Sequence, residues 1–256
     1  MSVEIAIFIC RKDNYGYLVH DADSGRTAAI DAPDAEAVSA ALRQRGWTLN
    51  DILITHHHAD HTDGIAALVE AFGATVTGPK AEAGKIKGLD VLVEPGDTVE
   101  LGATKFAVLG VPGHTLGHIA YHDAANGNLF TGDALFSLGV GRMFEGTPGP
   151  MWAGLVGLRD LPDETLVYCG HEYTLANAKF ALSVDPDNGA LKARAEEAQA
   201  QRDADRFTVP ARLGVEKQAN PFLRADQPVL ARAMGLDGGD PAAAFAALRK
   251  AKDNFS

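Results

Sequence analysis

Residues 55–64 read THHHADHTDG, and this stretch decides both the fold and the chemistry of the chain. It follows directly on Asp51-Ile52-Leu53-Ile54, a short apolar run that predicts a buried strand ending at the histidines. Imidazole and carboxylate groups are the ligands that a borderline divalent metal prefers, and the six residues 56–61 offer five of them. An affinity tag would lie at a terminus, so this internal cluster indicates a metal site.

The spacing within the stretch predicts two ions. In an extended chain, residues two apart point the same way, so His56 and His58 can bind one ion while His57 points elsewhere. Asp60 and His61 come where the chain begins to turn, and they can face a second ion.

Three other predicted strands also end in a polar residue that can bind a metal. These polar residues are His114, Asp133 and His171, and a glycine stands directly before each of them. Glycine in that place fits a chain that bends tightly where it approaches a ligand. A single His or Asp after a strand is usually structural, but four such strand ends with compatible donors indicate one shared site.

Charge and histidine content divide the chain into two parts. Residues 1–173 carry 11 Lys and Arg against 23 Asp and Glu, whereas residues 174–256 carry 12 against 11. All nine histidines lie at or before His171. We therefore predict a catalytic domain at 1–173 and a separate α-helical domain at 174–256. The acidic body argues against a nucleic-acid partner, because phosphate binding needs a basic face.

Features that are missing from the sequence bear on where the protein is located in the cell. No apolar window is long enough to span a membrane, and the N-terminus has no export signal. Cys10 and Cys169 are too few for a disulfide framework, which favours reduced thiols and a cytoplasmic protein. We expect no membrane partner and a monomer.

Many short strand patterns and few helices mark the first part. This mixture predicts two sheets packed face to face with helices outside, not a doubly wound parallel sheet. One helix is predicted to begin at Asp34 and end at Gly46, and the next to begin at Asp63, with Thr62-Asp63 as its cap. A short helix is predicted at 151–160. The tail predicts helices alone, at 172–182, 190–205, 228–234 and 241–252, with a linker at 209–224.

Together these motifs resemble the metallo-β-lactamase superfamily, over residues 1 to about 175. Within it the chain looks most like glyoxalase II, also called hydroxyacylglutathione hydrolase. The narrower resemblance rests on GRMFEGT at 141–147, CGHEYT at 169–174, NPFLR at 220–224 and LRKAKD at 248–253. It implies an α+β fold, a four-layer αββα metallo-β-lactamase sandwich with a C-terminal all-α domain.

The resemblance also implies a ligand set for two divalent ions. The first ion would be bound by His56, His58 and His114, and the second by Asp60, His61 and His171, with Asp133 bridging the two. Zinc is expected, and iron or manganese would also accept this mixture of nitrogen and oxygen donors.

Family knowledge further implies which residues bind the glutathione moiety. They are Arg142, Phe144, Tyr173, Arg249 and Lys252. The cationic members supply local positive charge to an acidic body, which would otherwise repel an anionic thioester. Val140 and Phe144 depart from the residues that many relatives carry, but neither is a metal ligand.

The implied activity is hydrolysis of S-(2-hydroxyacyl)glutathione, such as S-D-lactoylglutathione, to glutathione and a 2-hydroxy acid. This is the second step of methylglyoxal detoxification. A hydroxide held between the two ions would attack the thioester carbonyl, so no Ser or Cys nucleophile is needed. The thiolate leaves readily, since its conjugate acid has a pKa of about 8.5. Asp60 is an alternative general base, although its role as a ligand is preferred.

Two classes of alternative remain. The first is another enzyme of the superfamily, namely a lactonase, a persulfide dioxygenase, a β-lactamase or a nuclease. A dioxygenase would lack the full second set of ligands, a secreted β-lactamase would carry an export signal, and a nuclease would carry a basic inserted domain. The second class is a non-catalytic metal-binding protein, which would have lost some of the ligands.

Overall fold

The computed structural model describes residues 3–237 and 239–255. The outermost ends of the two predicted domains, residues 1 and 256, lie outside the described residues. The chain divides into two compact units. Unit 1 comprises Met1–Gly110 and Leu116–Gly132, and unit 2 comprises Val111–Thr115 and Asp133–Ser256. The predicted domain boundary after residue 173 stays a prediction.

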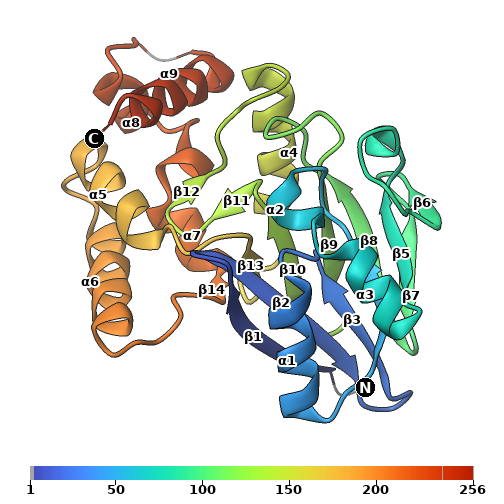
Figure 1. The fold of residues 1–256 in the computed structure, drawn as a ribbon. Coiled ribbons are helices and arrows are strands. Elements are labelled where there is room, and N and C mark those ends of the chain that lie inside the picture. Colours follow the sequence, from blue (N-terminus) through green and yellow to red (C-terminus); the bar gives the residue numbers. More distant parts are fainter. Residues whose placement is uncertain (1–2, 238, 256) are drawn as a thin grey trace. The chain divides into compact units, whose positions relative to one another are not determined.

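The first sheet of unit 1 has its strands in chain order (Figure 1). Its first three strands are antiparallel, and the later ones join in parallel. Parallel neighbours end at the same edge of a sheet, so the residues that follow β3 and β4 lie side by side. The strands are β1 Val3–Cys10, β2 Asn14–Asp21, β3 Arg26–Ile30, β4 Leu49–Leu53, β5 Thr75–Pro79 and β6 Val91–Val93.

Helices α1 (Ala35–Arg45) and α3 (Ile65–Phe72) cover this sheet and share an apolar core with it. The predicted limits of α1 are confirmed. The Asp34 side chain caps it by accepting hydrogen bonds from two backbone N–H groups, and Gly46 ends it in the left-handed conformation, with φ 70°.

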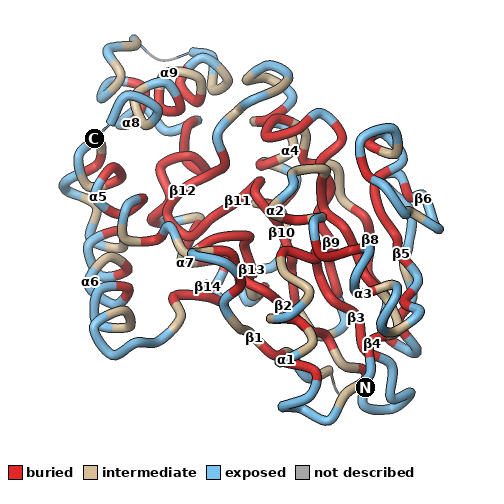
Figure 2. The backbone as a smooth tube through the Cα atoms, in the orientation of Figure 1, coloured by how far each residue is buried: buried red, intermediate tan, exposed pale blue. Residues whose placement is uncertain are grey.

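The second sheet of unit 1 is an antiparallel meander of β7 (Thr98–Leu101), β8 (Thr104–Gly110), β9 (Ile119–Asp123) and β10 (Asn128–Gly132). Figure 2 shows β9 and β10 buried along their length. The ring of Tyr17, from the first sheet, lies 5.7 Å from that of Phe130 on β10. The Tyr121 hydroxyl on β9 donates to the carbonyl of Ile54 at 2.9 Å. The predicted face-to-face packing of two sheets is therefore confirmed within unit 1.

A buried carboxylate joins the two sheets of unit 1. Asp21, at the end of β2, accepts hydrogen bonds from the backbone N–H of Ala103 (2.7 Å) and from both the N–H and the hydroxyl of Thr104 (3.0 and 3.1 Å). Burial by itself would raise the pKa of Asp21, but these bonds and one from Ser24 outweigh it and lower the pKa. The charged form of Asp21 therefore stabilises the junction.

The predicted start of the second helix, at Asp63, is wrong. The structure has a single turn, α2 (Ala59–Thr62), and then α3, which begins after Gly64 without any side-chain cap. The two expected capping residues are used elsewhere. The Thr62 hydroxyl donates to the carbonyl of His58, and the Asp63 carboxylate pairs with Arg11 at 2.6 Å. A local bond at Thr62 and a tertiary ion pair at Asp63 thus override the capping pattern.

Unit 2 contains the helical tail. The prediction that this tail consists of helices alone is wrong. Residues 211–212 form the short strand β14, because they pair with β13, which lies far away in the sequence. The predicted linker also holds a helix, α7. Unit 2 comprises β11 Leu135–Phe136, β12 Gly139–Val140, α4 Pro148–Arg159, β13 Leu166–Cys169, α5 Thr174–Val184, α6 Gly189–Asp203, β14 Ala211–Arg212, α7 Leu213–Ala219, η2 Pro221–Arg224, α8 Pro228–Ala233 and α9 Pro241–Asp253.

Both cysteines are free and buried, as expected for reduced thiols. Burial raises the pKa of Cys10 to about 12, and it does the same for Cys169. Among the described residues, none of the helices combines the length and the apolar character needed to cross a bilayer.

Candidate metal centre

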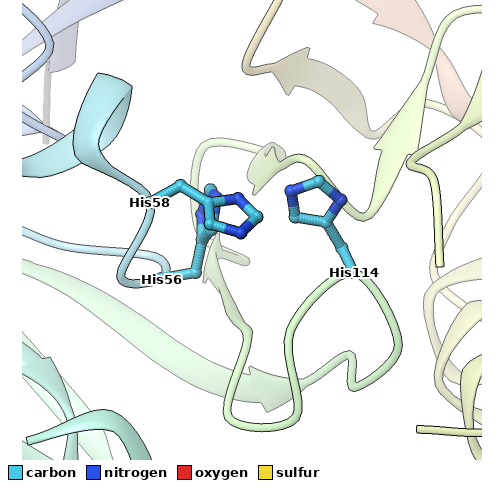
Figure 3. A group of neighbouring side chains, drawn as sticks. All are labelled: His56, His58 and His114. Carbon is cyan, nitrogen blue, oxygen red and sulfur yellow. The ribbon is translucent and has the colours of Figure 1, made fainter. Parts of the chain in front are cut away.

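The loop after β4 carries the first pair of donors. The Nε2 atom of His56 lies 3.1 Å from the Nδ1 atom of His58, and both rings are drawn in Figure 3. The hydroxyl of Thr55 contacts the other nitrogen of His56, Nδ1, at 3.0 Å. That contact fixes the ring so that it presents Nε2, as outer-shell partners of metal-binding histidines do.

The next two donors of unit 1 follow on the single turn of α2. His61 Nε2 lies 3.7 Å from a carboxylate oxygen of Asp60. The same carboxylate oxygen accepts a hydrogen bond from the Asn14 side chain at 3.0 Å, and Asn14 also binds the Asp60 carbonyl. Asp60 is thus held by the first residue of β2, which supports a fixed ligand more than a mobile general base.

Asp31 is a residue of this site that the sequence reasoning missed. It lies directly after β3 with φ 58° and is buried. Its carboxylate accepts from the backbone N–H and the hydroxyl of Thr55, at 2.7 and 2.9 Å, and contacts His61 Nδ1 at 2.8 Å. It orients His61 so that Nε2 is the ligand atom. The signal was present, because an Asp after the strand parallel to β4 must lie at the same edge of the sheet.

The remaining histidines of unit 1 lie outside the predicted ligand set. His57 turns away from its neighbours to contact Glu82 at 2.9 Å, as its place in the spacing predicts. Glu82 also accepts from the N–H of Gly117 at 3.0 Å, so it ties two loops together. His118 stacks on the ring of His56, with centroids 4.5 Å apart, and supports it. His20 stacks on Trp47 instead.

Unit 2 brings its own donors together around one oxygen atom. Asp133 Oδ2 lies 3.3 Å from Nε2 of His114 and 3.4 Å from Nε2 of His171. These separations are long for hydrogen bonds. Ligand atoms about 2.0–2.1 Å from an ion in a tetrahedral arrangement lie roughly 3.3–3.4 Å apart. The donor set of His114, Asp133 and His171 therefore fits a metal ion.

The backbone around these donors is specialised. His114, from the loop after β8 (Figure 3), has its Nδ1 atom 2.9 Å from the carbonyl of Arg142, which orients it to present Nε2. The glycines before His114 and Asp133 both have positive φ, 141° at Gly113 and 48° at Gly132. The tight bends predicted at these two glycines are confirmed.

Three of the predicted substrate-binding side chains lie around the donors of unit 2. Tyr173 stacks on His171 with centroids 4.8 Å apart and is 38% exposed. Phe144, 60% exposed, meets the ring of His114 edge-on at 5.3 Å. The Arg142 guanidinium lies 5.8 Å above the ring of Phe144 and is largely exposed. Exposed aromatic and cationic groups beside the donors can contact an anionic ligand.

The other two predicted cations differ in their surroundings. Arg249 is buried, and its guanidinium donates to the carbonyl of Val140 at 2.8 Å and to Asp253 at 3.0 Å. Lys252 donates to the carbonyl of Ala176 at 3.0 Å. Burial lowers the pKa of both groups. Their role in binding substrate stays a prediction, and for Arg249 the structure shows a backbone-holding role besides.

Comparison with known proteins agrees with this geometry. Residues 21–171 match the family described as Metallo-beta-lactamase superfamily, and residues 172–255 match Hydroxyacylglutathione hydrolase C-terminus. The chain is 51% identical to "Hydroxyacylglutathione hydrolase" of Ruegeria pomeroyi over 255 residues, all of both chains. It belongs to the hydroxyacylglutathione hydrolase family. The protein of the same name from Rhizobium meliloti is 50% identical over 99% of both chains. The predicted family and α+β fold class are confirmed.

Solved structures carry the same fold. ETHE1 from Myxococcus xanthus is 28% identical with a TM-score of 0.70, covering all of this chain and 92% of that one. TTHA1623 in a di-iron-bound form is 30% identical with a TM-score of 0.55, covering 66% of this chain and 91% of that one. A His and Asp donor set suited to a metal thus stands in a fold that holds two irons in a similar protein.

Proposed function

We propose that the chain hydrolyses S-(2-hydroxyacyl)glutathione to glutathione and a 2-hydroxy acid at a centre of two divalent ions. The observation that carries this is the place of Asp133, one of whose oxygens lies 3.3 and 3.4 Å from the Nε2 atoms of two histidines. Full-length relatives with the hydrolase name, at 50–51% identity, support the substrate.

The proposed ligand set is the one that the sequence resemblance implies. It is supported by the outer contacts that orient three of its five histidine rings, since separate protein groups hold Nδ1 of His56, His61 and His114. Zinc is the proposed metal, and iron is the nearest alternative, given the di-iron form of a similar protein. The first ion is assigned to His56, His58 and His114, and the second to Asp60, His61 and His171, with Asp133 shared.

The metal supplies Lewis acidity, which lowers the pKa of a bound water toward 7 and polarises the thioester carbonyl. The protein's own groups do the rest. Asn14 and Asp31 hold Asp60 and His61 in place, so the donor geometry exists before substrate arrives. No general acid is required, because the departing thiolate is the conjugate base of a thiol with a pKa of about 8.5.

Substrate binding is assigned to the exposed groups of unit 2. Arg142 offers an exposed guanidinium for a carboxylate of the glutathione moiety. Tyr173 and Phe144 supply exposed rings beside His171 and His114. Lys252 adds positive charge from α9. These contacts would bind substrate and transition state alike, so they act on KM more than on kcat.

The test combines metal analysis with a panel of substrates. Purified full-length protein is analysed for bound metals and assayed with several glutathione thioesters, a lactone and a β-lactam. We expect two equivalents of metal and a strong preference for S-D-lactoylglutathione. Two bound metals without thioesterase activity would refute the proposal, and a preference for the lactone or the β-lactam would favour a different enzyme of the superfamily.

The remaining parts of the proposal concern the setting of the enzyme. We place the boundary between a catalytic and a substrate-binding domain near residue 173. We further propose that the enzyme is a cytoplasmic monomer that acts in the second step of methylglyoxal detoxification. Chromatographic mass and cell fractionation test these two points.

A further inference from the structure

The hairpin of β11 and β12 joins Asp133 to the loop that orients His114. It begins two residues after Asp133 and ends two residues before Arg142, whose carbonyl contacts His114. Its base is clamped, because the N–H of Gly141 donates to the carbonyl of Ala134 at 3.3 Å. A Cβ atom at Gly141 would come within 1.9 Å of the Asp133 carbonyl oxygen and 3.1 Å of His114 Nδ1. Any displacement of the hairpin therefore moves both donors.

The tip of this hairpin is inserted into the helical tail. Leu138 is fully buried and packs in one apolar cluster with Ala178 of α5, Leu191 of α6 and Ala219 of α7. Its φ of 58° is unusual for a residue with a branched side chain. Such a conformation persists only where the surroundings enforce it. The tail must therefore supply contacts that hold the tip.

Glu216 of α7 supplies two of these contacts. It is fully buried, and its carboxylate accepts from the hydroxyl of Ser137 and from the N–H of Leu138, both at 2.7 Å. The buried guanidinium of Arg194, on α6, donates to the same hydroxyl at 3.1 Å. A buried carboxylate with several donors is a firm anchor, because each bond to a charged group is strong and each partner would otherwise be unsatisfied.

Other tail residues bind the backbone carbonyls of the hairpin. Asn220 donates to the carbonyls of Phe136 and Gly139, at 3.2 and 3.0 Å, and also to Glu216 at 3.2 Å. Asn177 donates to the carbonyl of Ser137 at 3.2 Å. Polar groups from α5, α6, α7 and the N-cap of η2 thus converge on one short hairpin.

We infer that Glu216 is a positioning residue for the metal centre, acting through Ser137 and Leu138 on Asp133 and His114. This inference rests on the proposed function only in taking Asp133 and His114 as metal ligands. It gives the tail a task beyond substrate binding, since the tail fixes the geometry of the donors that unit 2 contributes.

The test measures zinc affinity, not turnover, in the metal-stripped full-length chain by competition with a chromogenic chelator. Glu216→Gln keeps the size of the side chain but replaces one acceptor oxygen by an N–H₂ group. That group cannot accept from the Ser137 hydroxyl or the Leu138 N–H. We expect zinc affinity to fall by about 10-fold, the lower end of the range for losing a group that bonds a ligand directly, because Glu216 acts through the hairpin. If Glu216→Gln does not fold, Ser137→Ala replaces it, because it removes the hydroxyl that joins Glu216 and Arg194 to the hairpin.

The matched control is Asp185→Asn, which breaks another buried ion pair of the same unit. Asp185 pairs with Arg224 and binds Asn188, and the structure shows none of its described hydrogen bonds reaching the hairpin. We expect this variant to lose thermal stability while keeping the parent's zinc affinity within about threefold.

The inference is overturned if the Glu216 variant binds zinc as the parent does, or if both variants lose affinity equally. Since the titration uses no thioester, its outcome is separate from that of the proposed function. A parent that binds zinc but leaves every acyl-glutathione intact refutes the function alone.

Discussion

The two units hold their metal donors in opposite ways. In unit 1 the four donors lie within residues 56–61, and the loop is held by side chains at the edge of one sheet, Asp31 and Asn14. In unit 2 the three predicted donors are spread from His114 to His171, and a hairpin anchored in the helical tail adjoins two of them, Asp133 and His114. A compact motif needs only local support, whereas scattered ligands depend on the whole unit around them.

The largest loss is expected from Asp133→Ala, which removes the central carboxylate of the unit 2 donor set. Both histidine contacts would lose their shared oxygen, so zinc binding and activity should fall together. We expect kcat/KM to drop by roughly 10³-fold or more, equivalent to about 4 kcal/mol of transition-state stabilisation. Steady-state kinetics and metal analysis measure this, with Asp187→Ala, an exposed residue of the same unit, as the control. Retained metal would remove Asp133 from the ligand set.

The corresponding change in unit 1 is Asp31→Asn. It replaces the carboxylate that binds Thr55 and orients His61, but it leaves every proposed ligand in place. We expect a loss of about 10- to 100-fold in zinc affinity and in activity. Asp51→Asn, on the strand that leads into the same loop, should leave both unchanged. Equal behaviour of the two variants would show that the loop does not depend on Asp31.

Asp21→Asn separates stability from chemistry within unit 1. The pKa of Asp21 is lowered in the folded state, so its carboxylate stabilises the fold above the ordinary pKa of 3.8, and this is lost as the pH falls through the lower folded value. Urea unfolding at pH 7 should show a loss of about 1–3 kcal/mol in the variant, because buried N–H donors lose their acceptor. The difference in free energy of unfolding between parent and variant should become smaller below pH 3.8. Activity at pH 7 should be unchanged. If this difference in free energy of unfolding grew as the pH fell, the result would contradict the stabilising role of the Asp21 carboxylate.

The smallest expected effect is on substrate binding in unit 2. Arg142→Ala should raise KM about fivefold with little change in kcat, since an exposed ionic contact contributes about 1 kcal/mol. Arg249→Ala should also raise KM, but it should lower the free energy of unfolding as well, because it removes a buried bond to Val140. An Arg142 variant with the parent's KM would exclude this side chain from the substrate site.

The comparison also explains what the sequence could predict. The donor loop, the limits of α1 and the sandwich of unit 1 follow from local patterns: a short apolar run before the histidines, a capping Asp34, a terminating Gly46 and many short strand patterns with few helices. The start of α3 and the strand β14 do not, because Asp63 pairs with Arg11 and residues 211–212 pair with β13. Glu216 gives no local signal at all. An isolated Glu on a helix looks like a solvated surface residue until three-dimensional packing buries it.

The burial of the two thiols has a chemical consequence for their reactivity. With a pKa near 12, Cys10 and Cys169 stay protonated at neutral pH, and only the thiolate is an effective nucleophile. Electrophiles that modify exposed cysteines should therefore leave Cys10 and Cys169 unalkylated.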